Sequence, residues 1–232
     1  MFLFGIGWKN ARSSVQFGVG LYMLIYLGLI LRENMQLSGF FYYFFLGVFQ
    51  AATIHYFVAK IAGPFLFGRG WCGYACWTAI ILDLLPFKVP KSRDRVPKLG
   101  LLRYVVFAIT LGFTATLFIF KVQNLDNIIF ITFIVGNILY YVVGIVFAFY
   151  FKDNRAFCKY FCPITIFLKP CSYFSIMRIK NDKEKCIECK KCVKVCPMDV
   201  DMLDNRRSRK NGTECILCGT CVSVCPKKAL KM

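Results

Sequence analysis

Long runs of hydrophobic residues fill most of the chain up to about residue 150, and polar residues gather between these runs and after them. Four of the runs approach the roughly 20 residues that a helix needs to cross a hydrocarbon core of about 30 Å. They comprise residues 14–31, 40–62, 101–120 and 128–151. The runs are continuous, without the apolar/polar alternation of membrane β-barrel strands. The pattern therefore predicts an all-α membrane protein with four transmembrane helices.

The distribution of charge predicts how these helices are oriented. Lys and Arg concentrate before the first run, between the second and third runs, and after the fourth run, whereas the other two loops hold only Arg32 and Lys121. Short loops rich in Lys and Arg remain in the cytoplasm. We therefore expect a multi-pass protein of the cytoplasmic (inner) membrane, with the N-terminus and the C-terminal segment in the cytoplasm.

Overall composition agrees with this class of protein. Hydrophobic residues make up 58% of the chain and charged residues 18%, an apolar share above that of ordinary soluble domains. The formal net charge of +18 would suit nucleic acid, but the chain has no groove-reading motif, so we expect no nucleic acid partner. Basic residues beside a membrane surface predict contact with anionic lipids, at about 1 kcal/mol for each residue near the surface.

The thirteen cysteines lie on the predicted cytoplasmic side, where thiols stay reduced, so metal ligation is favoured over disulfides. The C-terminal segment contains "CIECKKCVKVCP" and "CILCGTCVSVCP". Each is a CxxCxxCxxxCP run, and the doubled run is similar to that of bacterial two-cluster ferredoxins. Zinc modules built from paired CxxC units lack the third cysteine. We therefore expect a membrane domain at residues 1–180 and a small ferredoxin-like domain at residues 181–232.

The resemblance to two-cluster ferredoxins implies which cysteines hold which cluster. In those proteins the fourth cysteine of each run ligates the other cluster. Carried over, the first [4Fe-4S] cluster has the ligands Cys186, Cys189, Cys192 and Cys225. The second [4Fe-4S] cluster has the ligands Cys215, Cys218, Cys221 and Cys196.

A second cysteine pattern occurs twice, in "GRGWCGYACW" at residues 68–77 and in "NRAFCKYFCP" at residues 154–163. An offset of 86 residues aligns six identical pairs, among them Arg69 with Arg155, Cys72 with Cys158 and Cys76 with Cys162. Each copy follows a pair of predicted spans, so the chain has the pattern of a duplicated helical hairpin whose two motifs meet at the cytoplasmic side.

The four CxxxC cysteines have several possible roles that the spacing does not separate. They are candidates for a third cluster, for another metal ion, for two redox-active dithiols, or for small apolar core residues. Arg69 and Arg155 are candidates to donate hydrogen bonds to sulfur and so tune a reduction potential, or to extend to lipid phosphates.

The second apolar run contains His55, the only histidine, with Gln50 nearby. An ionisable group inside a membrane span is a functional candidate. These two residues are candidates for binding a quinone oxygen or carrying its proton, and an interhelical hydrogen bond is the alternative. A single histidine excludes a bis-histidine haem.

Together, the apolar helices, the two CxxxC motifs and the doubled C-terminal run resemble the NapH/NosR/CcoG-like membrane-bound polyferredoxins, and NapH most of all in outline. The resemblance implies a membrane-anchored iron–sulfur electron-transfer subunit. It would relay electrons between quinone, or a cytoplasmic carrier such as a soluble ferredoxin, and other subunits of a membrane redox complex. A cupric-ion reductase or metalloenzyme maturation factor using the CxxxC thiols is one alternative. A non-catalytic redox sensor or assembly protein is another.

Overall fold

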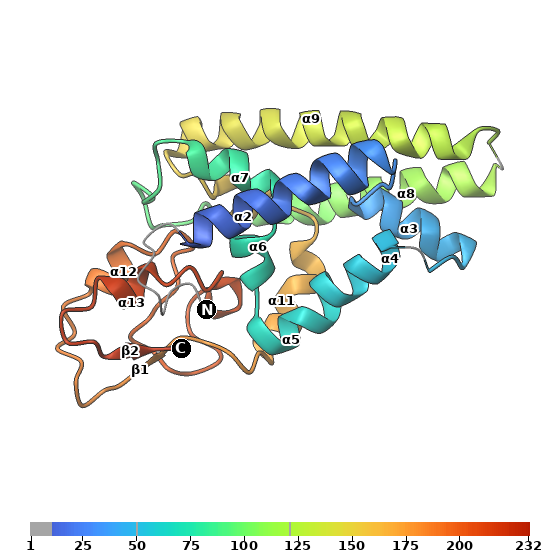
Figure 1. Ribbon diagram of the computed structural model, residues 1–232. Coiled ribbons are helices and arrows are strands. Elements are labelled where there is room, and N and C mark those ends of the chain that lie inside the picture. Colours follow the sequence, from blue (N-terminus) through green and yellow to red (C-terminus); the bar gives the residue numbers. More distant parts are fainter. Residues whose placement is uncertain (1–10, 50, 121) are drawn as a thin grey trace.

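The computed structural model describes residues 11–49, 51–120 and 122–232. Gln50, one of the two residues predicted for a quinone or proton site, lies outside these ranges. The described chain forms an elongated bundle of helices with a small module at one end, and that module carries a two-stranded sheet (Figure 1).

Within the described residues, three helical segments are long and apolar enough to cross a membrane. The first is residues Ala11–Ile30, formed by α2 (Ala11–Leu21) and the π-helical η1 (Tyr22–Ile30). The second is Leu99–Ile119, formed by the 3₁₀ turn η3 (Leu99–Leu101) and α8 (Leu102–Ile119). The third is α9 (Leu125–Phe151). These helices coincide with three of the four predicted runs and are compatible with a membrane protein.

The prediction of one continuous helix over residues 40–62 is wrong. The chain forms α3 (Leu37–Leu46) and then a second helical stretch of α4 (Ala51–Tyr56), η2 (Phe57–Ala62) and α5 (Gly63–Phe67). Gly47 ends α3 in the left-handed conformation, with φ of 67°, and its N–H donates to the carbonyls of Phe44 and Tyr43. Glycine adopts this conformation without the cost of a Cβ. The two stretches pack against each other, and α3 also packs against α8.

The two CxxxC motifs fold alike. The helices α6 (Gly70–Tyr74) and α10 (Ala156–Tyr160) have five residues each and start at the same offset of 86 residues. The aligned Arg69 and Arg155 precede them with similar backbone angles, φ −86° and ψ 27° against φ −102° and ψ 9°. The apolar segments that follow are also helical, as α7 (Trp77–Leu84) and α11 (Thr165–Tyr173).

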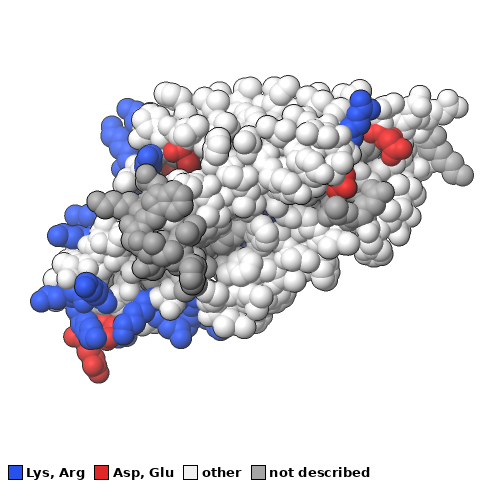
Figure 2. Space-filling view, viewed as in Figure 1, with Lys and Arg blue, Asp and Glu red and all other residues white. Residues whose placement is uncertain are grey.

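In the C-terminal module, the strand at the start pairs with the strand at the end. Strand β1 (Lys180–Asn181) pairs antiparallel with β2 (Leu230–Lys231). Between them lie α12 (Lys191–Lys194), the 3₁₀ turn η4 (Gly212–Glu214) and α13 (Thr220–Ser223). Figure 2 shows Lys and Arg side chains gathered at the end of the molecule that carries this module, while the helical body is almost free of charge on this face.

Candidate functional site

The four cysteines predicted to hold the first cluster line one cavity of the module. This cavity is bounded by Cys186, Cys189, Cys192 and Cys225. The backbone N–H of Ala229 lies 3.3 Å from the sulfur of Cys225, to which it donates. The remaining wall includes apolar residues such as Ile187 and Leu203 and the lysines that follow the cysteines.

The four cysteines predicted for the second cluster line a separate cavity. It is bounded by Cys196, Cys215, Cys218 and Cys221. The rest of its wall is apolar, with Ile179, Met198 and Met202 among its residues, and the N–H of Val200 donates to the sulfur of Cys196 over 3.4 Å. Burial raises the pKa of Cys215 to about 12, so its thiolate requires compensation by bound positive charge.

The backbone of the module repeats around both cavities. Left-handed residues stand at matching places in the two runs, offset by 29 residues. The pairs are Glu188 with Leu217, Lys190 with Gly219, and Asp199 with Lys228. Four thiols in each cavity, repeated loop turns and N–H donors to sulfur together fit a [4Fe-4S] cluster in each place.

The four CxxxC cysteines form a third group. Cys72 and Cys158 lie inside α6 and α10, whereas Cys76 and Cys162 lie just beyond the ends of these helices, so neither pair shares one helical face. Burial raises the pKa of Cys162, and the nearby sulfurs of Cys158, Cys72 and Cys76 raise it further. The structure thus brings all four sulfurs to one site, with Cys72 and Cys158 buried and Cys76 and Cys162 half-buried.

Positive charge surrounds this site. The side chains of Arg69 and Arg155 are 1% and 2% exposed, so neither extends to a lipid surface. Burial opposes ionisation of Cys72, but Arg69 and then Lys60 outweigh it and lower the pKa of this thiol. Arg155 donates to the Cys72 carbonyl over 3.2 Å and to Asp83 over 2.6 Å. Arg69 Nε is buried and has no hydrogen-bond acceptor in the described part of the chain.

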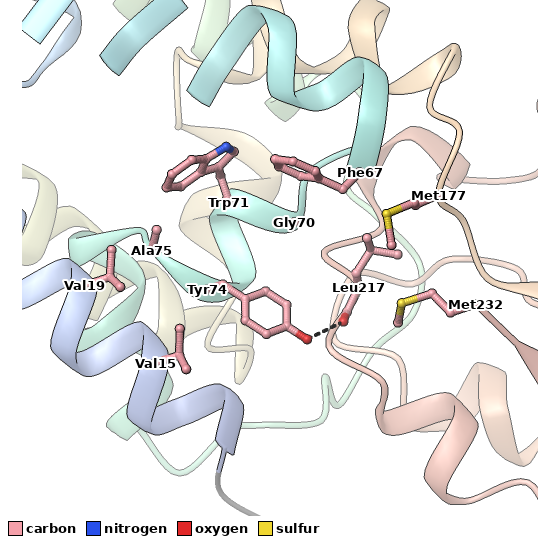
Figure 3. A pocket seen from close by; sticks show the side chains of 10 residues that line it. All are labelled: Val15, Val19, Phe67, Gly70, Trp71, Tyr74, Ala75, Met177, Leu217 and Met232. Carbon is pink, nitrogen blue, oxygen red and sulfur yellow. Dashed lines mark hydrogen bonds between the residues drawn. The ribbon is translucent and has the colours of Figure 1, made fainter. Parts of the chain in front are cut away.

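The CxxxC site touches the second cluster cavity directly. A Cβ added at Gly73 would lie 2.5 Å from the carbonyl oxygen of Ile216, so only glycine allows α6 to approach this closely. The Tyr74 hydroxyl donates to the carbonyl of Leu217 over 3.1 Å (Figure 3). Ile216 and Leu217 are the two residues between Cys215 and Cys218, so the first CxxxC helix packs on a ligand loop of the second cavity.

Two buried carboxylates attach the module to the bundle. Glu214 lies between Arg95 Nη1 and Lys169 Nζ, each at 2.7 Å, with Arg69 and Arg103 at 3.6 and 3.7 Å. Burial alone would raise the pKa of Glu214, but Arg69, Arg95 and Lys169 together lower it to about 2. Asp199 accepts from Lys159 Nζ at 2.5 Å. We name this ionic contact between Glu214, Asp199 and their basic partners the clamp.

Arg95 joins the two halves of the clamp. Its Nη1 pairs with Glu214, its Nε lies 3.6 Å from Asp199, and its Nη2 donates to the Met198 carbonyl over 2.7 Å. The charge pattern, which predicts membrane topology and lipid contact for the basic loop that holds Arg95, does not predict the clamp. It also misses Lys60, although a lysine inside an apolar run is itself a signal.

A largely apolar cavity of about 400 Å³ lies beside the CxxxC site (Figure 3). Val15 and Val19 of α2 form one wall, Trp71 and Tyr74 of α6 another, and Met177, Leu217 and Met232 a third. His55 is not among the residues that line this cavity, but it contacts Trp71, which is: the two rings are nearly perpendicular, with centroids 5.6 Å apart. In the described ranges, no three His, Cys, Asp or Glu side chains lie close enough to hold a single metal ion.

Comparison with known proteins identifies the chemistry. Residues 178–226 match a family model described as a 4Fe-4S dicluster domain. Residues 51–94 and 135–179, which include both CxxxC motifs, match one described as a 4Fe-4S binding domain. This is an iron–sulfur binding protein.

Two relatives of this iron–sulfur protein come from Methanocaldococcus jannaschii. Uncharacterized protein MJ0750 is 29% identical over 202 residues, which span 75% of this chain and 84% of the relative. Uncharacterized protein MJ0749 is 28% identical over 180 residues, spanning 73% of this chain and 68% of the relative. No solved structure matches the chain. The matched models and the apolar helices are consistent with a membrane iron–sulfur electron-transfer protein.

Proposed function

We propose that this protein is a membrane-anchored electron-transfer subunit that relays electrons between a quinone and a cytoplasmic carrier or redox partner complex. The observation that carries the proposal is a single packed core. Cys72 and Cys158 of the CxxxC site belong to it together with Cys192 of the first cavity and Cys196 and Cys221 of the second. Bound [4Fe-4S] clusters each accept and release one electron. A core that contains residues of all three cysteine groups excludes water and keeps the groups at fixed positions.

The four CxxxC cysteines hold a third [4Fe-4S] cluster in this proposal. Four thiolates and an oxidised cluster core carry a net charge of about −2, which is costly to bury without compensation. Arg69, Arg155 and Lys60 supply three buried positive charges around the cysteines. The free Arg69 Nε supplies a donor for cluster or thiolate sulfur. Asp83 and Glu214 balance part of this charge through Arg155 and Arg69, and the cluster thiolates would balance the rest.

The apolar cavity is the proposed binding place of the quinone. Val15 and Val19 belong to the first turns of the candidate span that starts at Ala11, so an apolar molecule in the bilayer could enter beside α2. Tyr74 and Trp71 bring this cavity next to the cysteine-bearing helix α6 (Figure 3). His55, which contacts Trp71, remains the predicted proton carrier.

The remaining architecture of the proposal follows the sequence predictions. The duplicated hairpins form the membrane domain, with the helices of residues 37–67 taking the place of the second span. The basic end of the molecule faces the cytoplasm (Figure 2), and those of its basic residues that lie next to the spans contact anionic lipids. Other subunits of a membrane redox complex contact the helices, whose lipid-facing surfaces expose large side chains such as Ile109 and Val135.

Iron content tests the proposed cluster number. Anaerobically purified wild type is compared with a variant in which Cys72, Cys76, Cys158 and Cys162 are replaced by Ser. Cys171→Ser is the matched control, because Cys171 lines none of the three sites. We expect about twelve iron per chain in the wild type and the control, and about eight in the fourfold variant, from four iron per cluster. About eight iron in all three would contradict a third cluster.

Electron transfer tests the relay itself. Reduced wild type is mixed with a short-chain quinone, and reoxidation of its clusters is followed by electron paramagnetic resonance. We expect rapid reoxidation in the wild type and slow reoxidation in the fourfold variant, whose ferredoxin-type clusters remain intact. Reoxidation by cupric ion but not by quinone would favour the metal-reductase alternative, and reoxidation by neither would favour a sensor.

A further inference from the structure

The first cluster cavity has a more exposed set of cysteines than the second. Cys189 is exposed, and the neighbouring Ile187 is 58% exposed. In the second cavity Cys196 and Cys221 are buried, Cys215 and Cys218 are half-buried, and the wall is apolar. The first cavity therefore offers a soluble partner the more accessible cysteine, Cys189.

Lysines border the first cavity. Lys190, Lys191 and Lys227 line the first cavity together with its cysteines, whereas the second cavity has no charged residue in its wall. Further lysines extend the positive surface along α12, next to β2 and across the sheet. The exposed members of this lysine surface are Lys180, Lys183, Lys185, Lys190, Lys191, Lys194, Lys227, Lys228 and Lys231.

Little negative charge offsets this surface. The acidic residues in the same segments are Asp182, Glu184 and Glu188. One ion pair forms there among the described residues, between Lys185 and Asp182 at 3.8 Å, and it is exposed. A bound cluster with four thiolates carries a charge of about −2, too little to neutralise nine lysines. The lysine surface therefore remains strongly positive when the module is loaded.

The lysine surface also lies away from the predicted membrane boundary. Figure 1 shows α12 and α13 at the extreme end of the molecule, beyond the first turn of α2. Basic residues that contact lipid phosphates are expected next to the ends of the spans. A positive surface around an exposed redox site at the far end is better suited to a soluble partner.

We infer that the lysine surface docks an acidic, soluble electron-carrier protein, and that electrons pass between this carrier and the site of Cys186, Cys189, Cys192 and Cys225. The inference rests on the proposed electron-transfer function and specifies its cytoplasmic partner. Each transfer is a single electron: the carrier's centre is oxidised by one electron as one cluster is reduced by one. Complementary charge raises association rates from about 10⁵–10⁶ to as much as about 10⁸–10⁹ M⁻¹s⁻¹ at low salt.

The probe is a reduced, acidic plant-type [2Fe-2S] ferredoxin, mixed anaerobically with the full-length oxidised holoprotein in nanodiscs. The test variant combines Lys190→Glu, Lys191→Glu and Lys194→Glu. The matched control combines Lys88→Glu, Lys91→Glu and Lys98→Glu, three exposed lysines outside the module with the same total change of charge. Each triple contains one lysine at positive φ, Lys190 or Lys98, so backbone effects are matched as well.

Two quantities are measured, the second-order rate of ferredoxin oxidation and the dissociation constant of redox-inactive, gallium-substituted ferredoxin. We expect the test variant to lose at least about tenfold in both, and the control to stay within about twofold. Raising salt from about 20 mM to about 500 mM should slow the wild type and leave the test variant almost unchanged, because screening removes the same attraction. Iron content should be equal in all three proteins.

Two results would overturn the docking inference. One is a rate and affinity unaffected by the lysine changes. The other is an effect that occurs only in nanodiscs of anionic phosphatidylglycerol and not in phosphatidylcholine, which would make the lysine surface a lipid-binding surface. Photoreduced deazariboflavin, a neutral donor, separates the two proposals. If it reduces the clusters of wild type and variant equally, the electron-transfer function stands whatever the ferredoxin result; if it reduces neither, that function fails.

Discussion

The clamp gives the sharpest quantitative prediction, through Glu214→Gln. This change keeps the size and shape of the side chain and removes its charge. Glu214 is fully buried, and its four basic partners all belong to the bundle: Arg69, Arg95, Arg103 and Lys169. The substitution therefore leaves several buried cations uncompensated at the contact between bundle and module.

The size of the effect follows from the pKa of Glu214, which is about 2 in the folded protein against an ordinary value of 4.5. That difference corresponds to about 3 kcal/mol at about 1.4 kcal/mol per pKa unit. Because folding lowers this pKa, the stabilisation is present in full above pH 4.5 and is lost as the pH falls toward 2. Breaking a buried ion pair by removing one partner costs about 3–5 kcal/mol, which agrees with the loss of about 3 kcal/mol expected from the pKa.

Amide hydrogen exchange measures the separation of module and bundle. The N–H groups of Ile176 and Met177 donate to the carbonyls of Phe65 and Leu66 over 3.0 and 2.7 Å, so they tie the segment that leads into the module to the end of α5. At neutral pH we expect both amides to exchange about a hundredfold faster in Glu214→Gln, the factor that about 3 kcal/mol gives. Glu184→Gln, at an exposed position, is the control. A change below about threefold would refute the electrostatic role of the clamp.

Two further predictions test the positions of the cysteine sites. Gly73→Ala should force α6 away from Ile216, weaken the contact by roughly 1–3 kcal/mol and speed the same amide exchange; Gly18→Ala, with no atom within 4 Å of the added Cβ, should leave it unchanged. Cys196→Ser should remove the same electron paramagnetic resonance signal as Cys215→Ser, and Cys192→Ser the other, because Cys196 lines the second cavity. If Cys196→Ser and Cys192→Ser affect one common signal, the crossed ligand sets are wrong.

Local sequence patterns were sufficient to predict the structure where the interacting residues are close together in the chain. The cysteines predicted as cluster ligands occur in two short runs with fixed spacing, and the resemblance to two-cluster ferredoxins divides them into the two groups that line the two cavities. Hydropathy likewise located the helices that include residues 101–119 and 128–151. It failed at residues 40–62 because an average over a window does not register that one residue, Gly47, can end a helix.

The clamp could not be predicted in this way. Arg95 and Glu214 are 119 residues apart, and no local pattern pairs them. The preference of Lys and Arg for cytoplasmic loops was already enough to explain why this loop is basic. The sequence feature that could have pointed to the clamp was Glu214, an acidic residue that lies beside Cys215 and follows a strongly basic stretch.

The clamp also explains why one particular cavity of the internally repeated module faces the bundle. Its two halves repeat the same left-handed turns at an offset of 29 residues, so the backbone alone does not distinguish the two cavities. The acidic residues of the clamp distinguish the two cavities. Asp199 follows Cys196 by three residues and Glu214 directly precedes Cys215, and both cysteines line the second cavity. The bundle therefore holds the second cavity against α6, which leaves the first cavity outermost with its lysines facing solvent.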